Sequence, residues 1–234
     1  MHHDYFDKFK NLKSQWSKIP VFSRFFIAIS YIIFLAVLPL LNWKHLIIYG
    51  LIEIIILFLS KLPLQYFFSR SLIVSVPAFI IALSASLFKN PEWFFFISLK
   101  SFLSVGIMII LISTSSFPSL ISVLQSIKMP GLFVSLLGFV YRYSFLLIDE
   151  FESLQRTYKI RAIGTNNKLK RTAISNITAA LFRRSLIRSD NVFDAMLSRG
   201  FKGTFLYIHK QGNPVSEYLI LILALIIFTG VRFV

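Results

Sequence analysis

The chain has 234 residues, of which 56% are hydrophobic and only 15% are charged. Soluble domains carry charge on about a quarter of their residues, so this composition is typical of a protein whose solvent is largely lipid. The 25 Lys and Arg against 10 Asp and Glu favour anionic lipid headgroups and an acidic protein partner. Nucleic acid is disfavoured because the apolar runs are long, and the absence of cysteine excludes disulfides, thiolate metal ligands and cysteine nucleophiles.

Four apolar runs in the first half of the chain are each close to the length that a bilayer core of roughly 30 Å requires. The sequence therefore predicts membrane spans at 25–41, 46–59, 72–88 and within 93–111. Polar breaks separate the runs, among them a predicted turn that extends from Lys61 through Pro63 to Arg70. A fifth apolar run, 218–228, predicts one more span.

The run 132–148 is apolar enough to resemble a short span, but Arg142 lies in its middle and acidic residues follow it directly. An arginine at the centre of a bilayer is costly even on lenient insertion scales. We therefore expect a helix that lies at the membrane interface or dips into it. If this helix crosses the bilayer instead, the C-terminus moves from the outer side to the inner side.

Basic residues predict the orientation, because Lys and Arg concentrate on the cytoplasmic side of membrane proteins. Five precede the first span, Lys61 and Arg70 flank the predicted turn, and 14 of the 25 fall within 113–211. We therefore expect a multi-pass protein of the inner (cytoplasmic) cell membrane with its N-terminus in the cytoplasm. Three regions are predicted: a membrane domain at 1–112, a cytoplasmic helical region at 113–211 and a C-terminal transmembrane helix at 212–234.

Helix-breaking residues divide the cytoplasmic region into one short helix and two long ones. The short helix begins at Phe117 and ends before Pro130. The first long helix is predicted at 132–163 and stops at Gly164, and the second is predicted at 172–199 and stops at Gly200. A glycine just past a helix end is the usual left-handed cap. The predicted fold is thus an all-α integral membrane protein with about five transmembrane helices and two long cytoplasmic helices.

Motifs that carry catalysis are absent from the sequence. It contains no phosphate-binding G-x-x-x-x-G-K-[ST], no Ser-His-Asp spacing and no H-E-x-x-H, and its four histidines are scattered. We therefore expect a non-catalytic subunit with no cofactor and no metal site.

Two ionisable residues fall inside predicted spans. Glu53 lies midway along the second span, and Lys100 lies within the fourth. Such groups are functional candidates because their burial in lipid is expensive. The alternatives are that Glu53 is a satisfied hydrogen-bond partner between helices and that the fourth span begins near Ser101.

Several blocks of the sequence together resemble one family. Leu59-Ser60-Lys61-Leu62-Pro63-Leu64 is similar to the SGLPL turn after the second span of transmembrane T components of energy-coupling factor (ECF) importers. The stretch from Tyr141-Arg142-Tyr143 to Asp149-Glu150 resembles their YRY…LLDE stretch. Leu181-Phe182-Arg183-Arg184-Ser185 and Ala195-Met196-Leu197-Ser198-Arg199-Gly200-Phe201 resemble the LFxRS…AMxxRGF block of the cobalt-type branch, CbiQ.

The resemblance implies a coupling subunit that joins two cytoplasmic ATPase subunits to a substrate-binding component in the membrane. Two long coupling helices would each end in a motif of a small residue, Arg and Gly, whose Arg enters a groove on one ATPase. Ser198, Arg199 and Gly200 match the second motif. The first motif is replaced by Ala162-Ile163-Gly164, with Arg161 placed early, so either Arg161 substitutes from the neighbouring helical face or this contact is apolar.

The substrate class follows from the branch that the sequence resembles. The block that ends in Phe201 favours an importer for cobalt, or for nickel, over a vitamin importer of the same architecture. A membrane-embedded enzyme that acts on lipid is a third alternative. It would need paired Asp or His motifs, whereas Asp149-Glu150 is the only acidic cluster.

Overall fold

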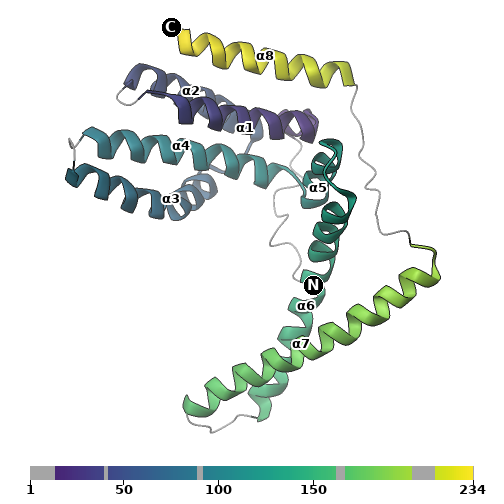
Figure 1. Cartoon of the computed structure of the whole chain (residues 1–234). Helices are drawn as coiled ribbons and strands as arrows, with labels where there is room; N and C mark the ends of the chain where they lie inside the picture. Colours follow the sequence, from purple (N-terminus) through teal and green to yellow (C-terminus); the bar gives the residue numbers. More distant parts are fainter. Residues whose placement is uncertain (1–13, 40–41, 89–91, 162–166, 202–213, 234) are drawn as a thin grey trace. The chain divides into compact units, whose positions relative to one another are not determined.

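A computed structural model describes residues 14–39, 42–88, 92–161, 167–201 and 214–233, and within these ranges the chain forms helices and no strand. The all-α prediction is therefore confirmed. The helices, in chain order (Figure 1), are η2 (Trp16–Lys18, a 3-10 turn), α1 (Val21–Val37), α2 (Trp43–Ser60), α3 (Leu64–Phe88), α4 (Glu92–Thr114), α5 (Phe117–Ser126), α6 (Gly131–Arg161), α7 (Asn167–Ser198) and α8 (Pro214–Phe233).

The chain divides into two compact units. The first contains α1–α4 and α8, and the second contains α6 and α7, with the boundary inside α5 between Val123 and Leu124.

Helix α4 is the centre of the first unit. It packs against α1, α2 and α3, while α8 packs on α1 (Figure 1). The fully buried side chains of this bundle are Tyr31, Leu35, Tyr49, Phe96, Ile107 and Ile110. Phe228 of α8 completes an aromatic cluster, with its ring centroid 5.9 Å from that of Tyr31 and 6.1 Å from that of Tyr49. Large aromatic rings in contact thus fix α8 to α1 and α2.

The outer faces of the bundle are apolar, as expected for helices that contact lipid. Phe58 is 70% exposed and Ile81 is 65% exposed, although both are large hydrophobic residues. Within the described residues, four helices are long and apolar enough to cross a membrane: α2, α3, α4 and α6, the last over Gly131–Ile160. Helix α1 and the stretch Glu217–Val231 of α8 are apolar but shorter. The run around Arg142, which the sequence placed at the interface, therefore belongs to a helix with the length and hydropathy of a span.

The turn predicted between Lys61 and Arg70 is shorter than the sequence suggested. Helix α3 begins at Leu64, so Arg70 lies inside it, because the carbonyl oxygen of Pro63 already accepts the backbone N–H groups of Tyr66 and Phe67. Lys61 is in the left-handed conformation with φ 53°. It occupies the place of the glycine in the SGLPL motif, and glycine adopts this conformation without steric cost.

The long helices lie close to the predicted positions. Helix α6 begins one residue before the predicted start, and residues 162–166 are outside the described ranges. Helix α7 begins at Asn167, five residues before the predicted start. Lys168, Lys170 and Arg171 are helix formers, and they extend the helix although they interrupt the apolar pattern.

Candidate coupling site

The C-terminal end of α7 is closed by a regular capping motif. The backbone N–H of Phe201 donates to the carbonyl oxygen of Met196 at 3.0 Å, and that of Gly200 donates to Leu197 at 2.9 Å. This pair of hydrogen bonds is the Schellman arrangement, which requires a left-handed residue just past the helix. Gly200 supplies it with φ +76°. The sequence therefore determines where α7 stops and in which direction the chain leaves.

Arg199 lies at the capped end of α7. It occupies the C-cap position between Ser198 and Gly200 and is exposed. Its backbone N–H is bonded to Met196 O at 3.0 Å, and the hydroxyl of Ser198 donates to Asp194 O at 2.9 Å. A cation at this end is favoured by the helix dipole, and a guanidinium can bind a carboxylate with two parallel hydrogen bonds. The geometry therefore suits Arg199 to an acidic groove on another protein.

The structure describes only the beginning of the first motif. Arg161 is the last residue of α6, while Ala162, Ile163 and Gly164 lie outside the described residues. The prediction that either Arg161 or an apolar contact replaces the usual arginine stays a prediction.

An ion pair joins the two long helices. Arg184 of α7 donates a hydrogen bond to Glu150 Oε1 of α6, and the Glu150 side chain is only 28% exposed. These residues come from two of the sequence blocks that carry the resemblance, and the fold brings the blocks together. Helices α6 and α7 pack against each other (Figure 1), and the pair links one helix to the other.

Reversing this pair gives a first prediction. Arg184→Glu should destabilise the α6–α7 contact by about 1 kcal/mol, because it places two carboxylates side by side in a partly exposed site. Adding Glu150→Arg should restore most of the loss. Unfolding of the purified chain followed by circular dichroism measures both effects. Equal instability of the single and double variants would contradict an interhelical role for the pair.

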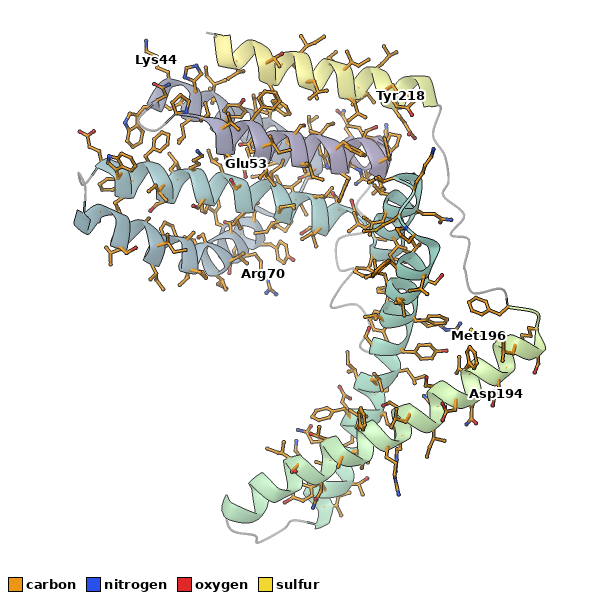
Figure 2. The ribbon with its side chains drawn as sticks, in the orientation of Figure 1. Lys44, Glu53, Arg70, Asp194, Met196 and Tyr218 are labelled. Atoms are coloured by element: carbon orange, nitrogen blue, oxygen red, sulfur yellow. The ribbon has the colours of Figure 1, made fainter. Side chains whose placement is uncertain are left out.

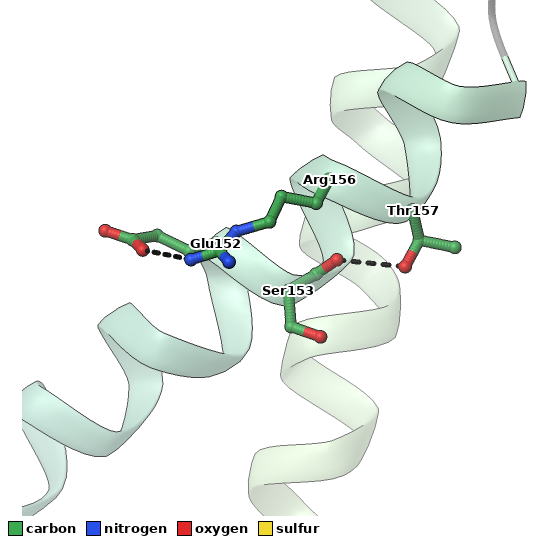
Figure 3. Close-up of polar contacts among 4 residues, drawn as sticks. All are labelled: Glu152, Ser153, Arg156 and Thr157. Carbon is green, nitrogen blue, oxygen red and sulfur yellow. Dashed lines mark hydrogen bonds and ion pairs between the residues drawn. The ribbon is translucent and has the colours of Figure 1, made fainter. Parts of the chain in front are cut away.

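Helix α6 is stiffened by contacts within its own length (Figure 3). Arg156 donates to Glu152 Oε2 at 3.0 Å across one turn, and the hydroxyl of Thr157 donates to Ser153 O at 2.9 Å. Ion pairs of this spacing support exposed helices by a few tenths of a kcal/mol each. They help to keep the last turns of α6 helical although this stretch is poor in apolar side chains.

The membrane bundle contains a second polar cluster around Glu53. This side chain is 3% exposed and lies inside the bundle (Figure 2), where Tyr31 Oη is 3.0 Å from Tyr49 O and 3.3 Å from Glu53 Oε2. Tyrosine has one proton to donate, and the shorter contact is to a carbonyl that can only accept. The Tyr31 hydroxyl can therefore donate to Tyr49 O or to Glu53 Oε2, both of which lie within hydrogen-bonding distance. The hydrogen-bond alternative for Glu53 is thus supported on one of its two oxygens.

The other oxygen of Glu53 faces Gly106 of α4. Within the described residues, Glu53 Oε1 is buried without a hydrogen-bond partner. A methyl group built on Gly106 would overlap that oxygen and would lie 2.9 Å from Phe67 Cζ. Gly106 therefore provides the space into which the carboxyl fits. Neither Tyr31 nor Gly106 was predicted from the sequence, although a glycine in an apolar run is a known sign of close helix packing.

Lys100 has a structural partner. Its ammonium donates to Ala36 O at 2.8 Å and to Leu38 O at 3.3 Å, which are carbonyls at the C-terminal end of α1. A cation at that end satisfies carbonyls that have no partner within the helix. Helix α4 begins at Glu92, so the helix extends well before Ser101, and the alternative in which the membrane span starts near Ser101 stays a prediction. Among the described residues, no group of three or more His, Asp or Glu side chains could hold a metal ion.

Comparison with known proteins identifies the family. The profile of the CbiQ family, described as a cobalt transport protein, matches residues 14–208 of this chain. The chain belongs to the CbiQ family. Both long helices and the cap at Gly200 lie within the matched residues, so the resemblance inferred from the motifs is confirmed.

Relatives of this CbiQ-family chain occur in archaea. Two uncharacterized proteins of Methanocaldococcus jannaschii are 27% and 24% identical, over 78% and 79% of this chain and 76% and 72% of their own lengths. A protein of Methanocorpusculum labreanum whose name describes a fused cobalt transport protein, CbiMQ, is 29% identical over 49% of this chain and 20% of its own length.

Proposed function

We propose that this chain is the transmembrane coupling (T) subunit of an ATP-driven ECF importer for cobalt or nickel. It binds two cytoplasmic ATPase subunits and a substrate-binding component in the membrane, and it performs no chemistry itself. The observation that carries this proposal is the exposed Arg199 on a rigid, Schellman-capped end of α7, in a chain of the CbiQ family.

The two long helices suit the transmission of force. Helix α7 has 32 residues and α6 has 31, and at 1.5 Å per residue each is about 45–50 Å long. The Glu150–Arg184 pair joins the two helices. A displacement imposed on Arg199 by an ATPase would therefore be passed along α7 to α6 rather than lost in a flexible loop.

Co-purification tests the proposal. The tagged chain, expressed together with candidate ATPase subunits and a candidate substrate-binding component of the same organism, should recover an ATPase. Vesicles that contain the reconstituted set should take up radiolabelled cobalt or nickel only when ATP is present. Recovery of the membrane component alone, without any ATPase, would refute the coupling role.

Orientation can be tested separately, because the chain has no cysteine to interfere with labelling. Ser175 is exposed on α7, and Lys44 is exposed at the start of α2. A membrane-impermeant maleimide should label Lys44→Cys in right-side-out vesicles and should label Ser175→Cys only in inside-out vesicles. Labelling of Ser175→Cys from the outer side would be incompatible with a cytoplasmic α7.

A further inference from the structure

Two adjacent cavities lie between α6 and α7. One has a volume of about 360 Å³ and is largely apolar, with Leu136, Phe139, Phe193 and Met196 in its lining. The other is larger, at about 630 Å³, and its lining contains Arg142, Arg184 and Arg188. Arg188 and Tyr143 line both cavities, so the apolar space and the cationic space meet at these residues.

The cationic cavity has more positive charge than the protein neutralises. Arg184 is paired with Glu150, the acidic residue in this lining. Arg142 lies 5.9 Å from the ring centroid of Tyr143, and no carboxylate pairs with it or with Arg188 in the part of the chain that the structure describes. Two exposed guanidinium groups are thus available to an anion.

The position of Arg142 indicates which anion. It lies within the stretch Gly131–Ile160, which has the length and hydropathy of a membrane span, and Val140 nearby is 62% exposed. A cation on such a helix is expensive in lipid unless it finds an opposite charge or reaches the headgroups. A phospholipid headgroup provides both, whereas an acidic protein segment would leave the neighbouring apolar cavity unfilled.

We propose that the α6–α7 groove binds one anionic phospholipid of the surrounding bilayer, with its phosphate between Arg142 and Arg188 and an acyl chain along Phe139, Phe193 and Met196. This inference depends on the chain being a membrane protein and not on the coupling function proposed above. Each of the two cavities has a volume within the range of roughly 300–1,000 Å³ that is usual for ligand sites.

Lipid retention tests this site in the full-length chain. The protein is reconstituted in vesicles of equal parts phosphatidylglycerol and phosphatidylcholine, extracted in mild detergent, and analysed for retained lipid by native mass spectrometry. The unchanged protein should retain phosphatidylglycerol in preference to phosphatidylcholine. Arg142→Gln or Arg188→Gln should each reduce that preference about fivefold, because one cation near an anionic headgroup is lost.

Matched variants separate a built site from general surface charge. Arg183 is exposed on α7 outside both cavities, so Arg183→Gln removes the same charge and should leave retention unchanged. Phe193→Ser should lower retention by removing acyl-chain contact, whereas Phe182→Ser, at an exposed site outside the cavities, should not. Equal retention of both lipids by the unchanged protein, or an equal loss in Arg183→Gln and Arg188→Gln, would overturn the proposal. Circular dichroism confirms that each variant is folded.

Discussion

Arg199→Glu is expected to abolish binding of the ATPase and metal uptake while leaving membrane insertion intact. The reason is electrostatic: in the proposed coupling role Arg199 enters an acidic groove of the ATPase, and that groove would repel a carboxylate at this position. Loss of one partner from a buried ion pair costs about 3–5 kcal/mol, which lowers affinity by a factor of about 150 to 5,000. Co-purification with the ATPase and uptake by reconstituted vesicles measure the two losses.

The control for this change is a second arginine on the same helix. Arg183 is exposed on α7 but is far from its capped end in sequence, so Arg183→Glu should retain the ATPase. Arg199→Lys should bind the ATPase less well than Arg183→Glu and better than Arg199→Glu. An ammonium keeps the positive charge but cannot form the two parallel hydrogen bonds of a guanidinium. Normal uptake by Arg199→Glu would remove Arg199 from the coupling role.

The cap that presents Arg199 should matter independently of charge. Gly200 has φ +76° and nothing within 4 Å of the position where a side chain would begin, so Gly200→Ala introduces backbone strain without a clash. That strain costs about 1 kcal/mol, and we expect ATPase affinity to fall about fivefold. The expected loss of affinity is smaller than that of Arg199→Glu, because the guanidinium is still present and only its position changes.

The positions of the helices along the chain could be predicted from the sequence, but the residue pairs that join the helices could not. Apolar runs and glycine breakers predicted the helices of the membrane bundle and both long helices to within a few residues at most ends. The exception at Arg70 arises because Pro63 can start a helix in polar sequence, which hydropathy does not detect. The Glu150–Arg184 pair joins residues 34 positions apart, and no local pattern specifies which of several arginines meets which carboxylate.

The environment of Glu53 shows the same limit. Its position inside an apolar run marked it as a candidate, since a buried carboxyl must find partners. Whether those partners were structural depended on which helix faces α2, and this is decided by packing of the whole bundle. Tyr31, Tyr49 and Gly106 surround it from α1, α2 and α4, so the carboxyl links three helices rather than opening to a binding site.

That arrangement predicts a large and specific effect at Gly106. Gly106→Ala places a methyl group where Glu53 Oε1 lies, and Phe67 blocks the other direction. Because Glu53 is 3% exposed and contacts Tyr31, it has little room to move. Overpacking of this kind costs about 1–3 kcal/mol, so the melting temperature of the purified chain in detergent should fall by several degrees.

Coupling between the two positions distinguishes this clash from a general intolerance of α4. In Gly106→Ala/Glu53→Ala the new methyl group enters space that the carboxyl has vacated, so the double variant should be more stable than the sum of the single effects by about 1–2 kcal/mol. Glu53→Gln keeps both the size and an oxygen that accepts the Tyr31 hydroxyl, and it should be nearly neutral. Gly50→Ala is the matched control, because the nearest side-chain atom, Leu103 Cδ2, is 3.9 Å from the added methyl group. At Gly50 the added methyl group makes an ordinary van der Waals contact, and alanine has a higher helix propensity than glycine. The melting temperature of Gly50→Ala should therefore stay unchanged or rise slightly. Strict additivity at Gly106 and Glu53 would mean that the carboxyl does not occupy the space beside α4.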